Sequence, residues 1–133
     1  MKFMMLVKHT NKVSGPPPKA LMDAINKITE DAVKNGSMLG GGGLAPIEQG
    51  SLVRITKGQV TVTDGPFAEA KEVVGGFAQF EFKSKEEAVK SAVEFMELHT
   101  KHWPGWEGVT EVRQMFGPEE FDQQMKELSC IAS

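Results

Sequence analysis

The sequence is poor in cysteine and has no long apolar run. Its one cysteine, Cys130, cannot form a disulfide within the chain, as is usual for proteins of the reducing cytoplasm. No apolar stretch approaches the roughly 20 residues of a membrane span, and the first residues lack the apolar core and cleavage site of a signal peptide. We therefore expect a cytoplasmic protein with no membrane partner.

Positive charge is not concentrated anywhere in the chain. The sequence has 15 Lys and Arg against 18 Asp and Glu, a net charge of -3, and its lysines are scattered among glutamates. Proteins that bind nucleic acid carry a basic patch or stripe, so we expect no nucleic-acid partner. The 133 residues suffice for one domain with a core. We expect residues 1–117 to form it and residues 118–133 to add a helix and a tail.

The spacing of apolar residues predicts the order strand, helix, strand, then a hairpin, then strand, helix, strand. The expected elements are a strand over 2–8, a helix over 19–34, a strand over 38–44, a hairpin of 51–56 and 59–63, a strand from 73 to 82, a helix from the cap Ser84 to near His102, a strand over 109–116, and a helix over 118–128 followed by a loose tail. In the second helix Ala88, Val89, Ala92, Val93 and Met96 form the expected buried stripe.

Four consecutive glycines, residues 40–43, allow two interpretations. A phosphate-binding loop would need a following Gly-Lys-Ser/Thr and a helix, which are missing. A strand or bulge that another backbone approaches closely is the better prediction, because glycine has no side chain to obstruct the approach.

The predicted order is that of a ferredoxin-like α+β fold, an antiparallel sheet with two helices on one face. The first strand is apolar on both sides, so the face without helices also needs cover. Packing of two sheets face to face in a homodimer supplies that cover, with Phe77 among the residues that point outward.

A turn and four charges stand together in residues 64–72, Asp-Gly-Pro-Phe-Ala-Glu-Ala-Lys-Glu, ahead of a Gly-Gly-Phe strand. This segment resembles the signature of the YCII-related family, also called DGPF-domain proteins. The match covers Asp64, Gly65, Pro66, Phe67, Glu69, Lys71, Glu72, Gly75, Gly76 and Phe77. The resemblance extends more loosely over residues 1 to about 116 and implies a dimeric α+β barrel. At residues 42–44, Gly-Gly-Leu replaces the acidic residue expected before Gly-Leu, so the role of that carboxylate is missing or displaced.

In the usual strand order of this fold, the strand over 109–116 lies next to 2–8, which is followed by 73–82 and then 38–44, all antiparallel. This order brings three separate segments to one edge of the sheet: His9, residues 64–71 and residues 99–106. His9 and Asp64 are the candidate catalytic residues, because a carboxylate bonded to an imidazole fixes its tautomer and raises its basicity. Alternatively, Asp64 bonds backbone N–H groups of its own turn and His9 is a solvated strand end.

Four residues are candidate ligand-binding side chains: Phe67, Glu69, Lys71 and Trp103. The charges behind the turn are equally typical of a solvated surface, and tryptophans here would also cap the core. His99 and His102 have the i, i+3 spacing of metal ligands, but no third ligand accompanies them, and a helix C-terminus favours histidine anyway. We expect no metal and no cofactor.

Two functions remain open. The first is a small-molecule enzyme that uses His9 and Asp64 for proton transfer. Relatives with this fold include isomerases, lyases and cofactor-free oxygenases. The second, which the family resemblance implies, is a non-catalytic ligand-binding or signalling domain linked to sigma-factor regulation. The fold alone does not decide between them.

Overall fold

The computed structural model describes residues 1–9, 16–65 and 73–132. Its elements are β1 (Lys2–His9), α1 (Lys19–Lys34), β2 (Met38–Gly43), the short 3-10 helix η1 (Ile47–Gln49), β3 (Ser51–Thr56), β4 (Gln59–Asp64), β5 (Val73–Glu81), α2 (Lys85–His102), β6 (Gly108–Met115) and α3 (Pro118–Ala132). The predicted α+β order is confirmed. The expected loose tail was wrong, because α3 continues to Ala132 where no glycine or proline interrupts it.

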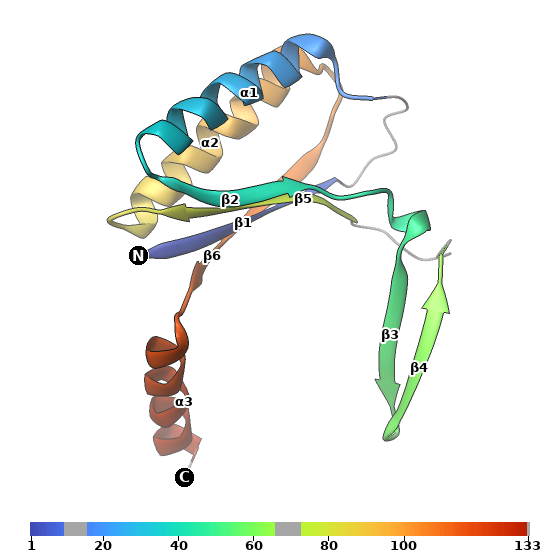
Figure 1. Ribbon diagram of the computed structural model, residues 1–133, viewed down its shortest axis with the longest axis vertical. Helices are drawn as coiled ribbons and strands as arrows, with labels where there is room; N and C mark the ends of the chain where they lie inside the picture. Colours follow the sequence, from blue (N-terminus) through green and yellow to red (C-terminus); the bar gives the residue numbers. More distant parts are fainter. Residues whose placement is uncertain (10–15, 66–72, 133) are drawn as a thin grey trace.

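Four strands form an antiparallel sheet in the order β2-β5-β1-β6 (Figure 1). Helices α1 and α2 lie side by side on one face, which we call the helix face, as the ferredoxin-like prediction requires. Strands β3 and β4 form a separate two-stranded sheet. None of the described helices is both long and apolar enough to span a membrane.

The core lies between β1 and α2. Phe3 and Met5 of β1 and Ala88 and Ala92 of α2 are buried together, with Phe80, Phe82 and Val112 packed around them. Because side chains alternate along β1, Phe3 and Met5 face the helices, whereas Met4 between them faces the other side of the sheet.

A side-chain cap begins α2. The Ser84 Oγ accepts a hydrogen bond from the Glu87 N–H at 3.2 Å, and Glu87 in turn accepts from the Lys83 N–H at 3.0 Å. The predicted cap Ser84 is confirmed, and Glu87 closes the helix start by reaching back to the residue before the cap. The predicted stripe of α2 was wrong at Val89 and Val93, which are 41% and 48% exposed. They lie about 100° around the helix from Ala88 and Ala92, beyond the edge strand β6.

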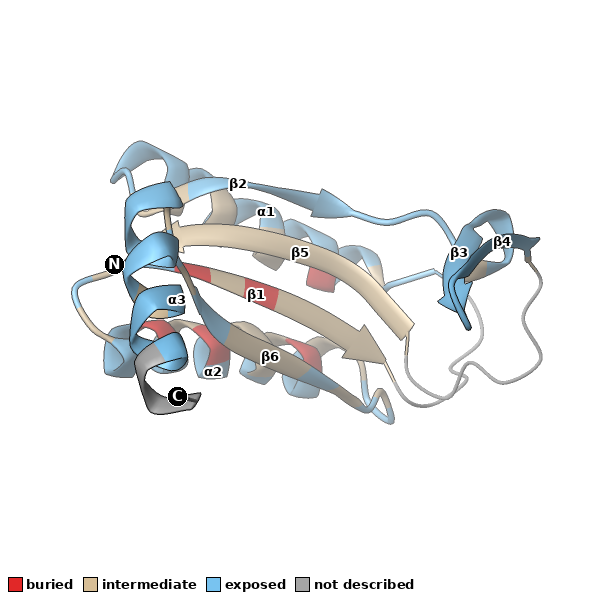
Figure 2. Ribbon diagram, turned by 90° about the horizontal axis from the view of Figure 1, so that it is seen from below, coloured by how far each residue is buried: buried red, intermediate tan, exposed pale blue. Residues whose placement is uncertain are grey.

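The face of the sheet opposite α1 and α2, here called the open face, is uncovered by any described element (Figure 2). Cross-strand pairing places Leu6 opposite Phe77, with Met4 two residues away on the same face. Polar groups share it, since Lys8 Nζ and Glu111 Oε2 form an ion pair at 2.8 Å. The hydrogen bond from Lys8 holds the pKa of the Glu111 carboxyl below its ordinary value. The open face is therefore a mixed surface with an apolar centre.

Strand β2 approaches β5 closely at Gly41. A Cβ at this position would lie 2.6 Å from the Phe77 carbonyl oxygen and 2.9 Å from Ala78 Cα. The expectation of a close backbone approach within residues 40–43 is confirmed. By contrast, a Cβ at Gly42 would meet nothing within 4 Å.

These neighbouring glycines give a matched test. Gly41→Ala should lower the free energy of unfolding by roughly 1–3 kcal/mol, because β2 must move away from β5 to admit the methyl group. Gly42→Ala should change it by less than about 1 kcal/mol. Urea denaturation of the two variants measures both values, and equal destabilisation would contradict the described β2–β5 contact.

Candidate functional site

A cavity of about 940 Å³ lies between the two helices and the sheet. Its apolar lining includes Met5, Val7, Ile25, Phe80, Phe95 and Leu98. At β2 the wall consists of backbone, because residues 41–43 are glycines. Polar side chains from the helices, including Thr29, Ser91 and Glu94, complete the lining. The size and the mixture of apolar wall with few polar groups are those of a small-molecule pocket.

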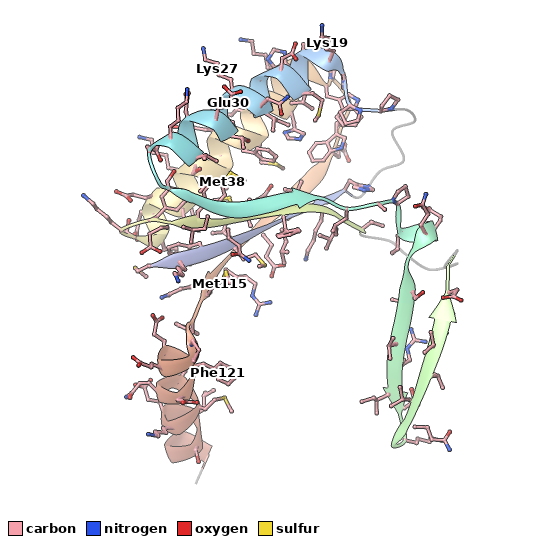
Figure 3. All side chains as sticks on the ribbon, in the orientation of Figure 1. Lys19, Lys27, Glu30, Met38, Met115 and Phe121 are labelled. Carbon is pink, nitrogen blue, oxygen red and sulfur yellow. The ribbon has the colours of Figure 1, made fainter. Side chains whose placement is uncertain are left out.

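Figure 3 shows how α1 contributes to this arrangement. Lys19, Lys27 and Glu30 point outward from α1, whereas Met38, which follows the helix, lies between α1 and the sheet. These three charged side chains of α1 thus face solvent, while the helix lines the cavity with both apolar and polar residues, among them Ile25 and Asp31.

His9 lies beside a lining residue of this cavity, Gly75, without being a lining residue itself. It is the last residue of β1 and, by alternation, shares the helix face with Val7, which lines the cavity. A Cβ built on Gly75, another lining residue, would lie 3.1 Å from His9 Cδ2 and 3.4 Å from His9 Nε2. The Nε2–Cδ2 edge of the half-buried imidazole therefore rests against the cavity wall.

Trp106 fills the space on the other side of His9. The cross-strand partner of His9 in β6 is Gly108. A Cβ on Gly108 would overlap Trp106 Cη2 and come within 2.6 Å of the Lys8 carbonyl oxygen. Because facing Cβ atoms in paired strands are only about 5 Å apart, the indole is a neighbour of the His9 ring. His9 thus stands between two glycines, and sequence reasoning missed this niche although Gly75 and Gly108 were its visible signals.

His99 is buried behind Trp106, with 6% of its surface exposed. Its Nδ1 donates to the Phe95 carbonyl oxygen at 3.0 Å, which leaves Nε2 without a proton in the neutral ring. The ring centroid lies 4.5 Å from that of Trp106 and 4.7 Å from that of Phe95. Burial lowers the pKa of His99 below its ordinary value, although the bond to Phe95 opposes the shift. His99, which the sequence places near the end of a helix, is thus a core residue.

Trp103 belongs to the same aromatic group, since its ring stacks on Trp106 with centroids 6.0 Å apart. The structure therefore brings Trp103, Trp106 and His99 to the end of the sheet where His9 lies, as the strand order predicts. The candidates Phe67, Glu69 and Lys71 lie outside the described residues.

Asp64 lies at the end of β4, exposed to solvent. Its Oδ1 accepts a hydrogen bond from the hydroxyl of Ser51, its cross-strand partner. This differs from both expected partners, a backbone N–H of its turn or an imidazole, because the paired strands place a hydroxyl directly opposite the carboxylate. Within residues 1–9, 16–65 and 73–132, no hydrogen bond joins Asp64 to His9. In the same ranges no three His, Cys, Asp or Glu side chains group as metal ligands.

Comparison with known proteins identifies one family. The sequence model of the YCII-related domain matches residues 1–95. No curated protein sequence matches the chain. Among solved structures, the chain is similar to 5-chloro-2-hydroxyhydroquinone dehydrochlorinase from Burkholderia phenoliruptrix AC1100 in complex with 2,5-dihydroxybenzoquinone, with 18% identity over 90% of this chain and 97% of that chain and a TM-score of 0.40.

The buried imidazole of His99 predicts an acid-sensitive fold. In the unfolded chain its pKa returns to about 6.5, so the unfolded state binds more protons between that value and the lowered native one. The stability that neutral His99 contributes is fully present above about pH 6.5 and is lost as the pH falls toward the native pKa.

The melting temperature should therefore fall more between about pH 7.5 and pH 5.5 in the wild type than in His99→Phe. His102→Phe, which places a phenylalanine at the same end of α2, is the matched control. An equal fall in the wild type and in His99→Phe would contradict the buried neutral imidazole.

Proposed function

The chain belongs to the YCII-related domain family, and we propose that it is an enzyme that moves a proton on a small, largely apolar molecule bound in the cavity between the helices and the sheet. One observation carries this proposal: the imidazole of His9 rests against Gly75, a residue of the cavity wall. An apolar pocket that ends at a group able to exchange protons near neutral pH is suited to general acid–base catalysis.

His9 Nε2 is the atom we assign to the proton transfer. It lies on the edge of the ring that meets Gly75, where a Cβ would stand 3.4 Å from the nitrogen, so only Gly75 separates this atom from the cavity. Trp106 stands beside Gly108, the cross-strand partner of His9, on the other side of the niche. A base in this setting takes a proton from a carbon or hydroxyl of the bound molecule. Returning that proton to a neighbouring atom completes an isomerisation, whereas giving it to a group that departs from the neighbouring carbon completes a lyase reaction.

The helices supply the groups that would orient the substrate. Thr29, Ser91 and Glu94 line the cavity among apolar neighbours and offer hydrogen-bond partners for a few polar atoms. The substrate class that fits is a small ring or short chain with a polar group at one end. We further assign ligand contacts to Phe67, Glu69, Lys71 and Trp103, on the family signature and on the stack of Trp103 with Trp106.

Asp64 enters the proposal as the carboxylate that orients His9. Its described partner is the Ser51 hydroxyl, so this role requires that Asp64 also reach the imidazole. Asp64→Asn separates the two roles. If Asp64 orients His9, the variant lowers turnover and moves the NMR signals of the His9 ring; if Asp64 serves only the hairpin, neither changes.

We also propose that the protein is a homodimer. The centre of the open face carries Met4, Leu6 and Phe77, which no described element covers. Packing of two such faces would give the two-sheet layer of a dimeric α+β barrel and leave one cavity in each chain.

The test of the proposed function begins with a substrate screen and compares turnover with binding. His9→Asn should lower turnover by about 100-fold to 10,000-fold, because it removes the base. Ligand-induced stabilisation against heat should persist, because the cavity lining is unchanged. His102→Asn, at the C-terminal end of α2, is the control and should keep full turnover.

Full turnover in His9→Asn would contradict the catalytic assignment. Binding of ligands in the cavity of the wild type without turnover of any would instead support the non-catalytic ligand-binding domain linked to sigma-factor regulation.

A further inference from the structure

The β3–β4 hairpin carries an exposed apolar face. Val53 pairs with Val62 and Ile55 with Val60, so these four side chains share one side of the hairpin. They are 69%, 66%, 73% and 64% exposed, in that order. The other side carries Arg54, Thr61, Thr56 and Gln59. We call the four-residue patch the hairpin face.

Such a hairpin does not hold its shape alone. Two strands without a third strand or a helix against them are marginally stable in water. Every residue of β3 and β4 is exposed, so no described part of the chain packs on the hairpin face. The alternating β-branched pattern therefore indicates a surface that is covered in the assembled protein.

Helix α3 carries a complementary surface. Phe121, Met125 and Leu128 recur at i, i+4 and i+7 and are 55%, 50% and 56% exposed. Figure 3 shows that α3, which carries Phe121, lies below the sheet and away from the core. The apolar stripe of α3, defined by these three residues, likewise lacks a partner within the described ranges.

The charges of the two segments match. Helix α3 has four carboxylates and one lysine, whereas the hairpin has two cations, Arg54 and Lys57, and one carboxylate. The opposite net charges of α3 and the hairpin favour contact between these two segments. The like charges of two hairpins, or of two α3 helices, disfavour contact between identical segments.

Within one chain the two segments stand apart. Figures 1 and 2 show both projecting on the side of the open face, α3 at one end of the sheet and the hairpin at the other. A two-fold rotation that exchanges the ends of the sheet brings the hairpin of one copy to α3 of the next, and the same contact then forms twice. The open face, proposed above as the dimer interface, lies between the two contacts.

We propose that the hairpin face of each chain packs on the apolar stripe of α3 in a second copy. The two contacts extend the sheet-to-sheet interface at both ends. Because Asp64 ends β4, the partner's helix would also fix the position of that carboxylate. The dimer thus completes a part of the site that one chain leaves unsupported.

Cross-linking tests which segments meet. In a Cys130→Ser background, the double variant Val62→Cys/Met125→Cys is treated with a short bismaleimide after ¹⁵N-labelled and unlabelled chains have been mixed and reassembled. The expected product is a covalent dimer in which residue 62 of one chain joins residue 125 of the other, identified by peptide pairs of mixed isotope. Thr61→Cys/Met125→Cys, with the cysteine on the opposite side of the hairpin, is the control and should react far less.

Two results would overturn the proposal: a yield of the 62–125 pair no higher than that of the control, or a product dominated by 62–62 pairs. A measurement without cross-linking gives a second check. Val53→Ser/Val62→Ser should raise the dimer dissociation constant by roughly tenfold or more, whereas Thr61→Ser/Thr63→Ser should leave it nearly unchanged. Equal effects of the two pairs would also contradict the proposal.

Discussion

The structure depends on a sheet whose apolar side chains are buried on one face only. Helices α1 and α2 cover Phe3 and Met5, while Met4 and Leu6 on the same strand face away from them. A strand that is apolar on both faces is stable only if both are covered. The homodimer we propose would supply that second cover, and the exposed hairpin and terminal helix both extend on the side of the open face.

Glycines shape the candidate site within each chain. Gly41 lets β2 approach β5, Gly75 gives the imidazole of His9 a place against the cavity wall, and Gly108 gives Trp106 its place beside His9. A methyl group would collide with a neighbour at Gly41 and at Gly108, and at Gly75 it would press on the His9 ring at 3.1 Å. The proposed chemistry thus depends on glycine at these positions as well as on the histidine itself.

The sequence predicted the elements and the strand order well, because their signals are local: period-2 alternation in β1, the Ser84 cap of α2, and turn residues at Lys57 and Gly58. It predicted less of the site. The burial of His99 and the niche around His9 depend on which residues meet across strands and helices, and a helix-end histidine looks the same in sequence whether buried or exposed. The Ser51–Asp64 bond likewise follows from the hairpin register, which had been predicted without its side-chain consequence.

Sedimentation equilibrium at micromolar concentration tests most directly whether a second copy completes the fold. A homodimer should give a mass of twice the 14.5 kDa of the chain. Phe77→Asp, which places a charge at the centre of the open face, should give a monomer or an insoluble protein, whereas Val33→Asp on α1, which is also exposed, should remain a dimer. A wild-type protein that sediments as a stable single chain throughout this range would contradict the account.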